Sequence, residues 1–267
     1  MAPMDRARRL LSTLRSRSSL AIAVSGGVDS MTLTAFAHRH SECAVSMFHA
    51  VSPAVPATST ELVRAYARRE GWRLTVLDAG EFDDPDYRAN PVNRCYFCKT
   101  NLYARIRKAT ADTIASGTNR DDLSDFRPGL KAADQHGVVH PFVESDFDKE
   151  AVRALARAER LTDVAELPAQ PCLSSRIETG IAIDAADLAF VDETERALRS
   201  LLAYPATIRC RVRRSGVVIE LDGVSSTDWK ALESDARARC AGTGRVLVGV
   251  SPYRRASAFL GAPGVRS

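Results

Sequence analysis

The sequence predicts an α/β protein: a parallel sheet with helices on both faces, followed by a small C-terminal α+β domain. Short apolar runs alternate with helical patterns as far as about Arg176, which is typical of parallel strands joined by crossover helices. Beyond Arg176 the order changes to a helix, a hairpin, a second helix and a last strand. We therefore expect two domains, residues 1–178 and residues 179–267.

Each strand is predicted from a run of apolar and β-branched residues, and each helix from apolar residues at helical spacing. The strands expected in the first domain are residues 20–24, 44–51, 74–77, 113–115 and 138–139. The helices expected there run from the end of a glycine turn through Phe36 and Ala37, near 61–69, around 102–108 and near 149–159. The second domain is expected to contain a helix over 185–202, a hairpin of 207–213 and 217–221, a helix near 229–240 and a strand near 246–250.

The composition excludes several classes of protein. Gly and Pro number 15 and 12, far below the share of about 25 to 30% that marks low-complexity chains, so a disordered or fibrous protein is excluded. The formal net charge of +4 favours an anionic ligand and argues against a nucleic-acid partner. No run approaches the roughly 20 apolar residues that cross a bilayer, and no signal-type apolar core follows the basic start. We therefore expect a cytoplasmic protein with no membrane partner.

A glycine turn, Ser25-Gly26-Gly27-Val28-Asp29-Ser30, follows the first expected strand. Gly26 and Gly27 lack side chains that would keep an anion from the backbone N–H groups, and the next helix presents its positive N-terminus to the same place. Ser25 and Ser30 can donate hydroxyl hydrogen bonds, while Asp29 is suited to position Mg²⁺. The alternative is a plain turn with a capping serine.

A second glycine-bearing loop, Gly117-Thr118-Asn119-Arg120-Asp121-Asp122, follows the expected strand at 113–115. Because the carboxyl ends of parallel strands share one edge, this loop should face the same cleft as residues 25–30. Gly117 and Asn119 are therefore candidates for nucleotide binding. Asp121 and Asp122 could hold Mg²⁺, for which we select Asp122, or could merely cap a helix.

The cysteines indicate reduced thiols or metal ligands, because six in a chain of 267 residues do not suggest a small disulfide scaffold. Cys95 and Cys98 form a CxxC pair, and Cys172 follows Pro171. Three thiolates would leave one coordination position of a metal centre open. The alternatives are a redox disulfide between Cys95 and Cys98 and a structural zinc completed by a histidine. The other cysteines are expected to be buried: Cys43, Cys210 and Cys240.

The turn from Ser25 to Ser30 resembles the pyrophosphate loop, or PP-loop, of ATP pyrophosphatases. These proteins cleave ATP between its α and β phosphates and leave AMP on an acceptor oxygen. The turn lacks the Gly-Lys-[Ser/Thr] ending of a kinase-type loop, which disfavours transfer of the γ-phosphate. The resemblance implies ATP and Mg²⁺ as cofactors, with AMP and pyrophosphate as products.

Three further stretches resemble the LarE family, whose enzymes insert sulfur during synthesis of the nickel-pincer nucleotide cofactor of lactate racemase. They are Asn93 to Lys99, Gly117 to Leu123 with its continuation Asp125-Phe126-Arg127-Pro128-Gly129, and Pro171 to Arg176. They occur in the family's order. The resemblance covers residues 20–180 in strong motifs and the C-terminal domain more weakly.

The resemblance implies a two-stage reaction on pyridinium-3,5-biscarboxylic acid mononucleotide. ATP adenylates a carboxylate and releases pyrophosphate, and sulfur then displaces AMP to give a thiocarboxylate. In some members the cysteine matching Cys172 surrenders its own sulfur and becomes dehydroalanine. In others, three cysteines hold a [4Fe–4S] cluster that carries an additional sulfide, supplied as sulfide or cysteine-derived sulfur. Because Cys95 and Cys98 are present, we expect the cluster-bearing type; homo-oligomers are typical of the family.

Basic residues in and after the last of these motifs complete the candidate site. Arg176 could attract a nucleotide substrate, the alternative being a surface ion pair. Arg209, Arg211 and Arg213 alternate along an expected strand, which would place three guanidiniums on one face. Guanidinium forks suit a phosphomonoester, and the resemblance points to Arg211 and Arg213 as phosphate ligands and to Glu195 as a polar residue near the site. The alternative is a solvated strand face.

Three other functions compete with ATP-dependent sulfur transfer to the mononucleotide. A tRNA thiolase would activate a base carbonyl in the same way, but the modest charge and the lack of an evident RNA-binding appendage argue against it. A ligase that uses ammonia would not need Cys95, Cys98 and Cys172. A non-catalytic nucleotide- or cluster-binding regulator would be excluded by substrate-dependent release of pyrophosphate.

Overall fold

The structure is a computed structural model that describes residues 3–124, 127–169 and 171–253. These residues form two compact units. The first comprises residues 3–84 and 93–169, and the second comprises residues 85–92 and 171–253. Residues 85–92 and 171–178, which the sequence prediction placed in the first domain, therefore belong to the second unit. No helix in the described ranges is both long and apolar enough to span a bilayer.

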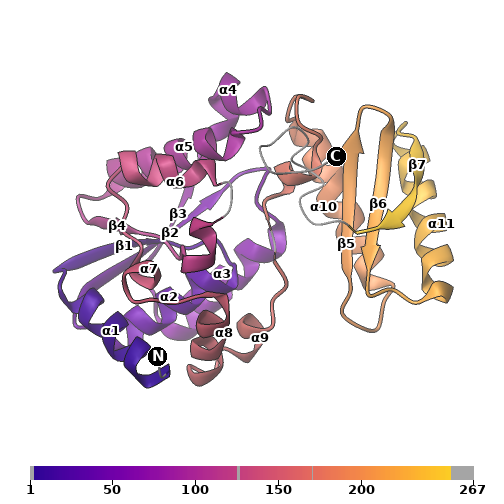
Figure 1. The fold of residues 1–267 in the computed structure, drawn as a ribbon. Helices are drawn as coiled ribbons and strands as arrows, with labels where there is room; N and C mark the ends of the chain where they lie inside the picture. Colours follow the sequence, from indigo (N-terminus) through magenta and orange to yellow (C-terminus); the bar gives the residue numbers. More distant parts are fainter. Residues whose placement is uncertain (1–2, 125–126, 170, 254–267) are drawn as a thin grey trace. The chain divides into compact units, whose positions relative to one another are not determined.

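The first unit is built on a four-stranded sheet in the order β3-β2-β1-β4 (Figure 1). All neighbouring strands are parallel, so their carboxyl ends lie at one edge. The strands are β1 (Ser19–Ala23), β2 (Ala44–Val51), β3 (Leu74–Asp78) and β4 (Thr113–Ala115). The strand expected at 138–139 is reduced to a single parallel bridge between Val139 and Ala115.

Helices cover both faces of this sheet, which confirms the predicted α/β fold. One face is covered by α1 (Pro3–Arg15), α2 (Val28–His40), α3 (Ala57–Glu70), α8 (Lys149–Ala158) and α9 (Thr162–Ala165). The other is covered by α5 (Arg94–Ala109) and α6 (Pro128–Gln135). The short helix α7 (Pro141–Glu144) packs against α1.

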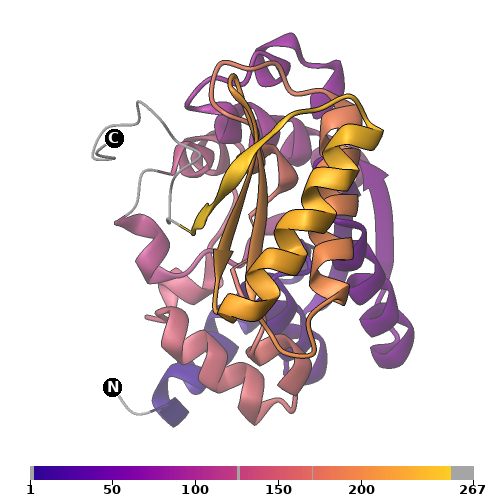
Figure 2. The same ribbon diagram turned by 90° about the vertical axis from the view of Figure 1, so that its right-hand side faces the viewer.

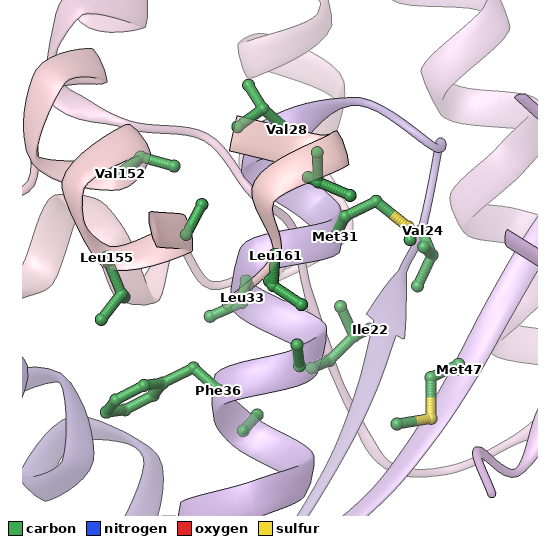
Figure 3. Close-up of a cluster of buried hydrophobic side chains, with 14 of the residues drawn as sticks. Ile22, Val24, Val28, Met31, Leu33, Phe36, Met47, Val152, Leu155 and Leu161 are labelled. Atoms are coloured by element: carbon green, nitrogen blue, oxygen red, sulfur yellow. The ribbon is translucent and has the colours of Figure 1, made fainter. Parts of the chain in front are cut away.

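The core of the first unit fixes the position of α2, whose start forms part of the glycine turn. Met31, Leu33 and Phe36 of this helix are at most 5% exposed. They pack in one cluster with Ile22 of β1 and Leu155 of α8 (Figure 3). Because apolar residues surround α2 on several sides, its N-terminus is held at the carboxyl end of β1.

The second unit contains a three-stranded sheet in the order β5-β6-β7. β5 (Thr207–Arg213) and β6 (Gly216–Asp222) form the predicted hairpin, and β7 (Leu247–Pro252) runs parallel to β6. Helices α10 (Ala185–Ser200) and α11 (Ser226–Gly242) lie side by side against these strands (Figure 2). This confirms the small α+β domain, to which the structure adds the short helix α4 (Pro85–Arg88).

Candidate functional site

The glycine turn between β1 and α2 is held in a shape that excludes a side chain. Gly26 has a φ angle of +84°, and an added Cβ would lie 2.9 Å from the carbonyl oxygen of Ser59. Ser30 Oγ accepts a hydrogen bond from the backbone N of Ser25 at 3.0 Å and donates to the carbonyl oxygen of Gly27 at 3.2 Å. The two serine hydroxyls lie 3.1 Å apart. The turn thus gathers the two glycines and two serines that the sequence singled out.

The loop after β4 packs directly on this turn. A Cβ on Gly117 would lie only 2.6 Å from the backbone N of Ser30, so glycine is required for the close approach. Asn119 is 2% exposed, and its Nδ2 donates to Asp29 Oδ1 at 3.0 Å. Its Oδ1 accepts a hydrogen bond from the backbone N of Asp121 at 3.0 Å. The two glycine-bearing loops therefore form one site at the carboxyl edge of the sheet.

Asp29 also contacts a cation that sequence reasoning missed. Lys149 Nζ lies 2.5 Å from Asp29 Oδ2. Lys149 is the first residue of α8, after the N-cap residue Asp148, and its backbone N donates to Asp121 Oδ2 at 3.0 Å. The available signal was the helix expected from about residue 149, which follows the segment 138–139; Val139 of that segment forms a parallel bridge with Ala115 of β4.

Asp122 has a capping role in the structure. One of its oxygens accepts a hydrogen bond from the backbone N of Asn119 at 3.1 Å, and the other lies 2.8 Å from Arg127 Nη2. Across the described residues, no three His, Cys, Asp or Glu side chains gather closely enough to hold a metal ion. Asp125 and Phe126 of the same motif lie outside the described residues.

Cys95 and Cys98 are the second and fifth residues of α5, three residues apart. Residues at this spacing are neighbours on one helix face. Both are half-buried reduced thiols. Helix α6 packs closely against the start of α5, because a Cβ on Gly129 would lie 3.5 Å from the carbonyl oxygen of Cys95 and 3.0 Å from Lys99 Cγ. Two thiols are thus presented from one rigid element of the first unit.

Cys172 belongs to the second unit and precedes a 3₁₀ turn, Leu173–Arg176. Its thiol is half-buried. Arg176 Nη1 donates to the carbonyl oxygens of Pro171 at 2.7 Å and Cys172 at 3.3 Å. The backbone that carries this cysteine is therefore fixed by a guanidinium.

Arg176 forms a buried ion pair rather than the surface pair considered from the sequence. Its side chain is 3% exposed, and its Nε and Nη2 donate to the two oxygens of Glu195 at 2.9 and 3.0 Å. Glu195 Oε1 also accepts a hydrogen bond from the backbone N of Cys210 at 3.0 Å. Burial is tolerated because charge and hydrogen-bonding groups are both matched.

The arginines of β5 also differ from the solvated face considered above, because Arg209 and Arg211 are only 5% and 6% exposed. Burial lowers the pKa of Arg209 to about 10. Glu220 of β6 accepts from Arg211 Nε at 3.0 Å and from Arg213 Nη2 at 2.9 Å. Arg211 Nη1 also donates to the carbonyl oxygen of Ser175 at 2.8 Å. Sequence reasoning missed Glu220, although an acidic residue inside an otherwise apolar strand was visible there.

The three cysteines without sequence partners are buried as predicted: Cys43, Cys210 and Cys240. Burial raises the pKa of each of these thiols. They therefore stay protonated near neutral pH and are suited to packing rather than to ligation.

The first unit, with a glycine turn after β1 and a second loop packed on it, has the PP-loop fold. No protein-family profile matches the chain. The chain is 36% identical over 184 residues to the uncharacterized protein slr1717 of Synechocystis, which covers 67% of this chain and 68% of that protein. It belongs to the same family as that protein.

Two more distant relatives extend this comparison. The uncharacterized protein MJ0830 of Methanocaldococcus jannaschii is 27% identical over 205 residues, or 75% of this chain and 77% of that protein. The pyridinium-3,5-bisthiocarboxylic acid mononucleotide synthase of Lactiplantibacillus plantarum is 29% identical over 222 residues, or 79% of this chain and 78% of that protein. The alignments to all three relatives extend over two thirds or more of this chain.

Proposed function

We propose that this protein is an ATP-dependent sulfurtransferase that converts a carboxylate of pyridinium-3,5-biscarboxylic acid mononucleotide into a thiocarboxylate. One observation supports the proposal: two glycine-bearing loops pack on each other at the carboxyl edge of the sheet, in a chain that is 29% identical to a pyridinium-3,5-bisthiocarboxylic acid mononucleotide synthase. The relative's name supplies the class of product. The packed loops would supply a place for ATP to activate a carboxylate.

The residues of the first unit fit a nucleotide with Mg²⁺. The backbone N–H groups of the turn and the N-terminus of α2 would bind the phosphates. Asp29 would be a Mg²⁺ ligand, since hard cations prefer carboxylate oxygens, and Lys149 would then be released to contact a phosphate. A substrate carboxylate oxygen would attack the α-phosphorus, and the bond from that phosphorus to the oxygen bridging to the β-phosphorus would break. Pyrophosphate leaves, and the carboxylate carries AMP as its leaving group.

Cys172 is the residue common to both routes of sulfur delivery. We propose that Cys172, Cys95 and Cys98 would together hold a [4Fe–4S] cluster with one open iron position, and such a cluster would supply sulfide when bound. On the sacrificial route the Cys172 thiolate attacks the acyl carbonyl and AMP leaves. Loss of the Cα proton and cleavage of the Cβ–Sγ bond then give dehydroalanine and the thiocarboxylate.

The arginine network of the second unit would bind the phosphate of the substrate. Arg213 is 35% exposed at its side chain, whereas Arg211 is 7% exposed and shares Glu220 with it. We assign the direct phosphate contact to Arg213, with Arg211 and Arg176 as buried supports. The assembled protein is proposed to be a homo-oligomer.

The decisive experiment is anaerobic incubation with ATP, Mg²⁺ and the pyridinium dicarboxylate mononucleotide. We expect AMP and pyrophosphate as products. We also expect one oxygen of the substrate to be replaced by sulfur, which mass spectrometry detects as a change in the mass of the mononucleotide. Formation of ADP, or turnover with tRNA and none with the mononucleotide, would overturn the proposal.

The sulfur source is tested by measuring iron, acid-labile sulfide and the visible spectrum of anaerobically prepared protein. The cluster route predicts broad absorption and roughly four irons per chain. Cys95→Ala should abolish both, while Cys240→Ala, at a buried position, serves as the matched control. A colourless protein whose Cys172 loses the elements of H₂S in one turnover would instead establish the sacrificial route.

A further inference from the structure

Residues 85–92 form a short excursion of the chain, meaning a segment that leaves the first unit and returns to it. This segment contacts the turn that follows Cys172. The chain belongs to the first unit as far as Asp84 and rejoins it at Asn93, directly before α5. Between these points it is part of the second unit. Ordering such an excursion costs backbone entropy, so its contacts must offset that cost.

Asn90 makes the most specific of these contacts. Its φ angle is +53°, an uncommon value for a residue other than glycine, and the following Pro91 favours extended backbone instead. The residue is completely buried, and its Nδ2 donates to the carbonyl oxygens of Glu178 at 2.8 Å and Ile181 at 2.9 Å. Its own carbonyl oxygen accepts from the backbone N of Gly180 at 3.0 Å. A conformation of this kind persists only where surrounding contacts impose it.

Tyr87 reaches the turn itself. Its hydroxyl lies 2.5 Å from Ser174 Oγ, and the two residues are 1% and 0% exposed. Ser174 stands two positions after Cys172, in the turn that Arg176 ends, and Arg176 donates hydrogen bonds to the backbone just before this turn. Hydrogen bonds to Tyr87 and Arg176 therefore fix this turn, and Cys172, which precedes it, is half-buried while Ser174 is fully buried.

We propose that Tyr87 and Asn90 are positioning residues for Cys172. They hold the segment from Ser174 to Ile181, and through it the backbone that presents the thiol. Only Asn93 and Arg94 separate the excursion from Cys95, so the backbone that fixes the Cys172 turn continues directly into the helix of the CxxC pair. This inference rests on the proposed function, which gives Cys172 its chemical role.

The test measures alkylation of each cysteine over time in the reduced protein, without ATP, iron or substrate. Tyr87→Phe removes one hydroxyl. Asn90→Gly keeps the left-handed backbone accessible and removes the amide. Tyr66→Phe is the matched control, because it deletes a buried tyrosine's hydroxyl bond to Asp163 in the first unit.

We expect Cys172 to be alkylated about fivefold faster in Tyr87→Phe, the factor that one net hydrogen bond produces in an opening equilibrium, and faster still in Asn90→Gly, which removes two hydrogen bonds. Cys210 and Cys240 are buried in the same unit and should stay protected, which separates local positioning from unfolding. An unchanged or slower rate at Cys172, or a faster rate that appears only with exposure of Cys210 and Cys240, would overturn the inference. Because no cofactor is present, the result is independent of whether the protein transfers sulfur.

Discussion

The two units place their charges in contrasting environments. In the first, Lys149 and Asp29 are 36% and 25% exposed at their side chains and meet beside a glycine turn. In the second, Arg176 and Glu195 are 3% and 8% exposed. An exposed pair contributes little stability, whereas a buried pair cannot lose one member without leaving an uncompensated charge. The first pair is therefore suited to yield to a ligand, and the second to maintain a shape.

The largest effect is expected on breaking the buried pair. Glu195→Ala should lower the free energy of unfolding of the second unit by about 3 to 5 kcal/mol, because Arg176 would remain buried without its counter-ion. The measurement is urea unfolding followed by the fluorescence of Trp229, which lies in α11.

Asp187→Ala is the matched control for Glu195→Ala, because it removes the partly exposed partner of Arg245 from the same helix. It should cost at most about 1 kcal/mol. Equal losses in the two variants would contradict the distinction between a fixed pair and an exchangeable one.

A smaller effect is expected from Gly117→Ala in the first unit. The added Cβ would lie 2.6 Å from the backbone N of Ser30 and 2.8 Å from the carbonyl carbon of Asp29. Backbone cannot give way as a flexible side chain can, so we expect a loss of about 1 to 3 kcal/mol in unfolding free energy together with weaker nucleotide binding. Gly242→Ala adds the same methyl group where nothing lies within 4 Å and should cause neither change.

The sequence was most informative where the structure depends on residues that are close together along the chain. Apolar runs marked the strands, and paired glycines marked the turn at Ser25 to Ser30, because these signals are local. Lys149 was missed because its partner Asp29 lies 120 positions away. The contact of Tyr87 with Ser174 spans 87 positions and left no periodic signal. Burial of Arg211 in β5 likewise depends on Glu220 of the adjacent strand, a pairing that composition alone does not reveal.

Replacing Lys149 tests whether the partly exposed pair with Asp29 gives way to a ligand. Lys149→Ala should weaken ATP binding at least tenfold in the presence of Mg²⁺, because a charged hydrogen bond to phosphate is worth about 1.5 to 3 kcal/mol. Its unfolding free energy should change by less than about 1 kcal/mol. Titration calorimetry with and without Mg²⁺ measures the first quantity, with Lys131→Ala on the exposed side of α6 as the control. Tighter binding in the variant would show that Lys149 only competes with the ligand.

The smallest effect concerns His49, which lies behind the glycine turn and is 1% exposed. Its Nδ1 donates to the carbonyl oxygen of Val24 at 2.7 Å, and its Nε2 lies 2.9 Å from Thr60 Oγ1. Burial lowers the pKa of His49, and burial lowers that of His140 as well. In the unfolded chain a histidine has a pKa of about 6.5. Below that pH the unfolded chain therefore binds protons that the buried histidines of the folded unit do not bind. Stability falls as the pH drops through this range, by at most about 1.4 kcal/mol per pH unit for each histidine.

This acid sensitivity should be confined to one unit, because all five histidines of the chain lie in the first. Trp72 belongs to the first unit and Trp229 to the second, so urea unfolding above and below about pH 6.5 can follow each unit separately. The Trp72 transition should shift to lower urea in acid, and His49→Gln should reduce that shift, while His38→Gln at an exposed position should not. A shift that His49→Gln leaves intact would assign the sensitivity to His140. An equal shift at Trp229 would contradict the confinement of the acid sensitivity to the first unit.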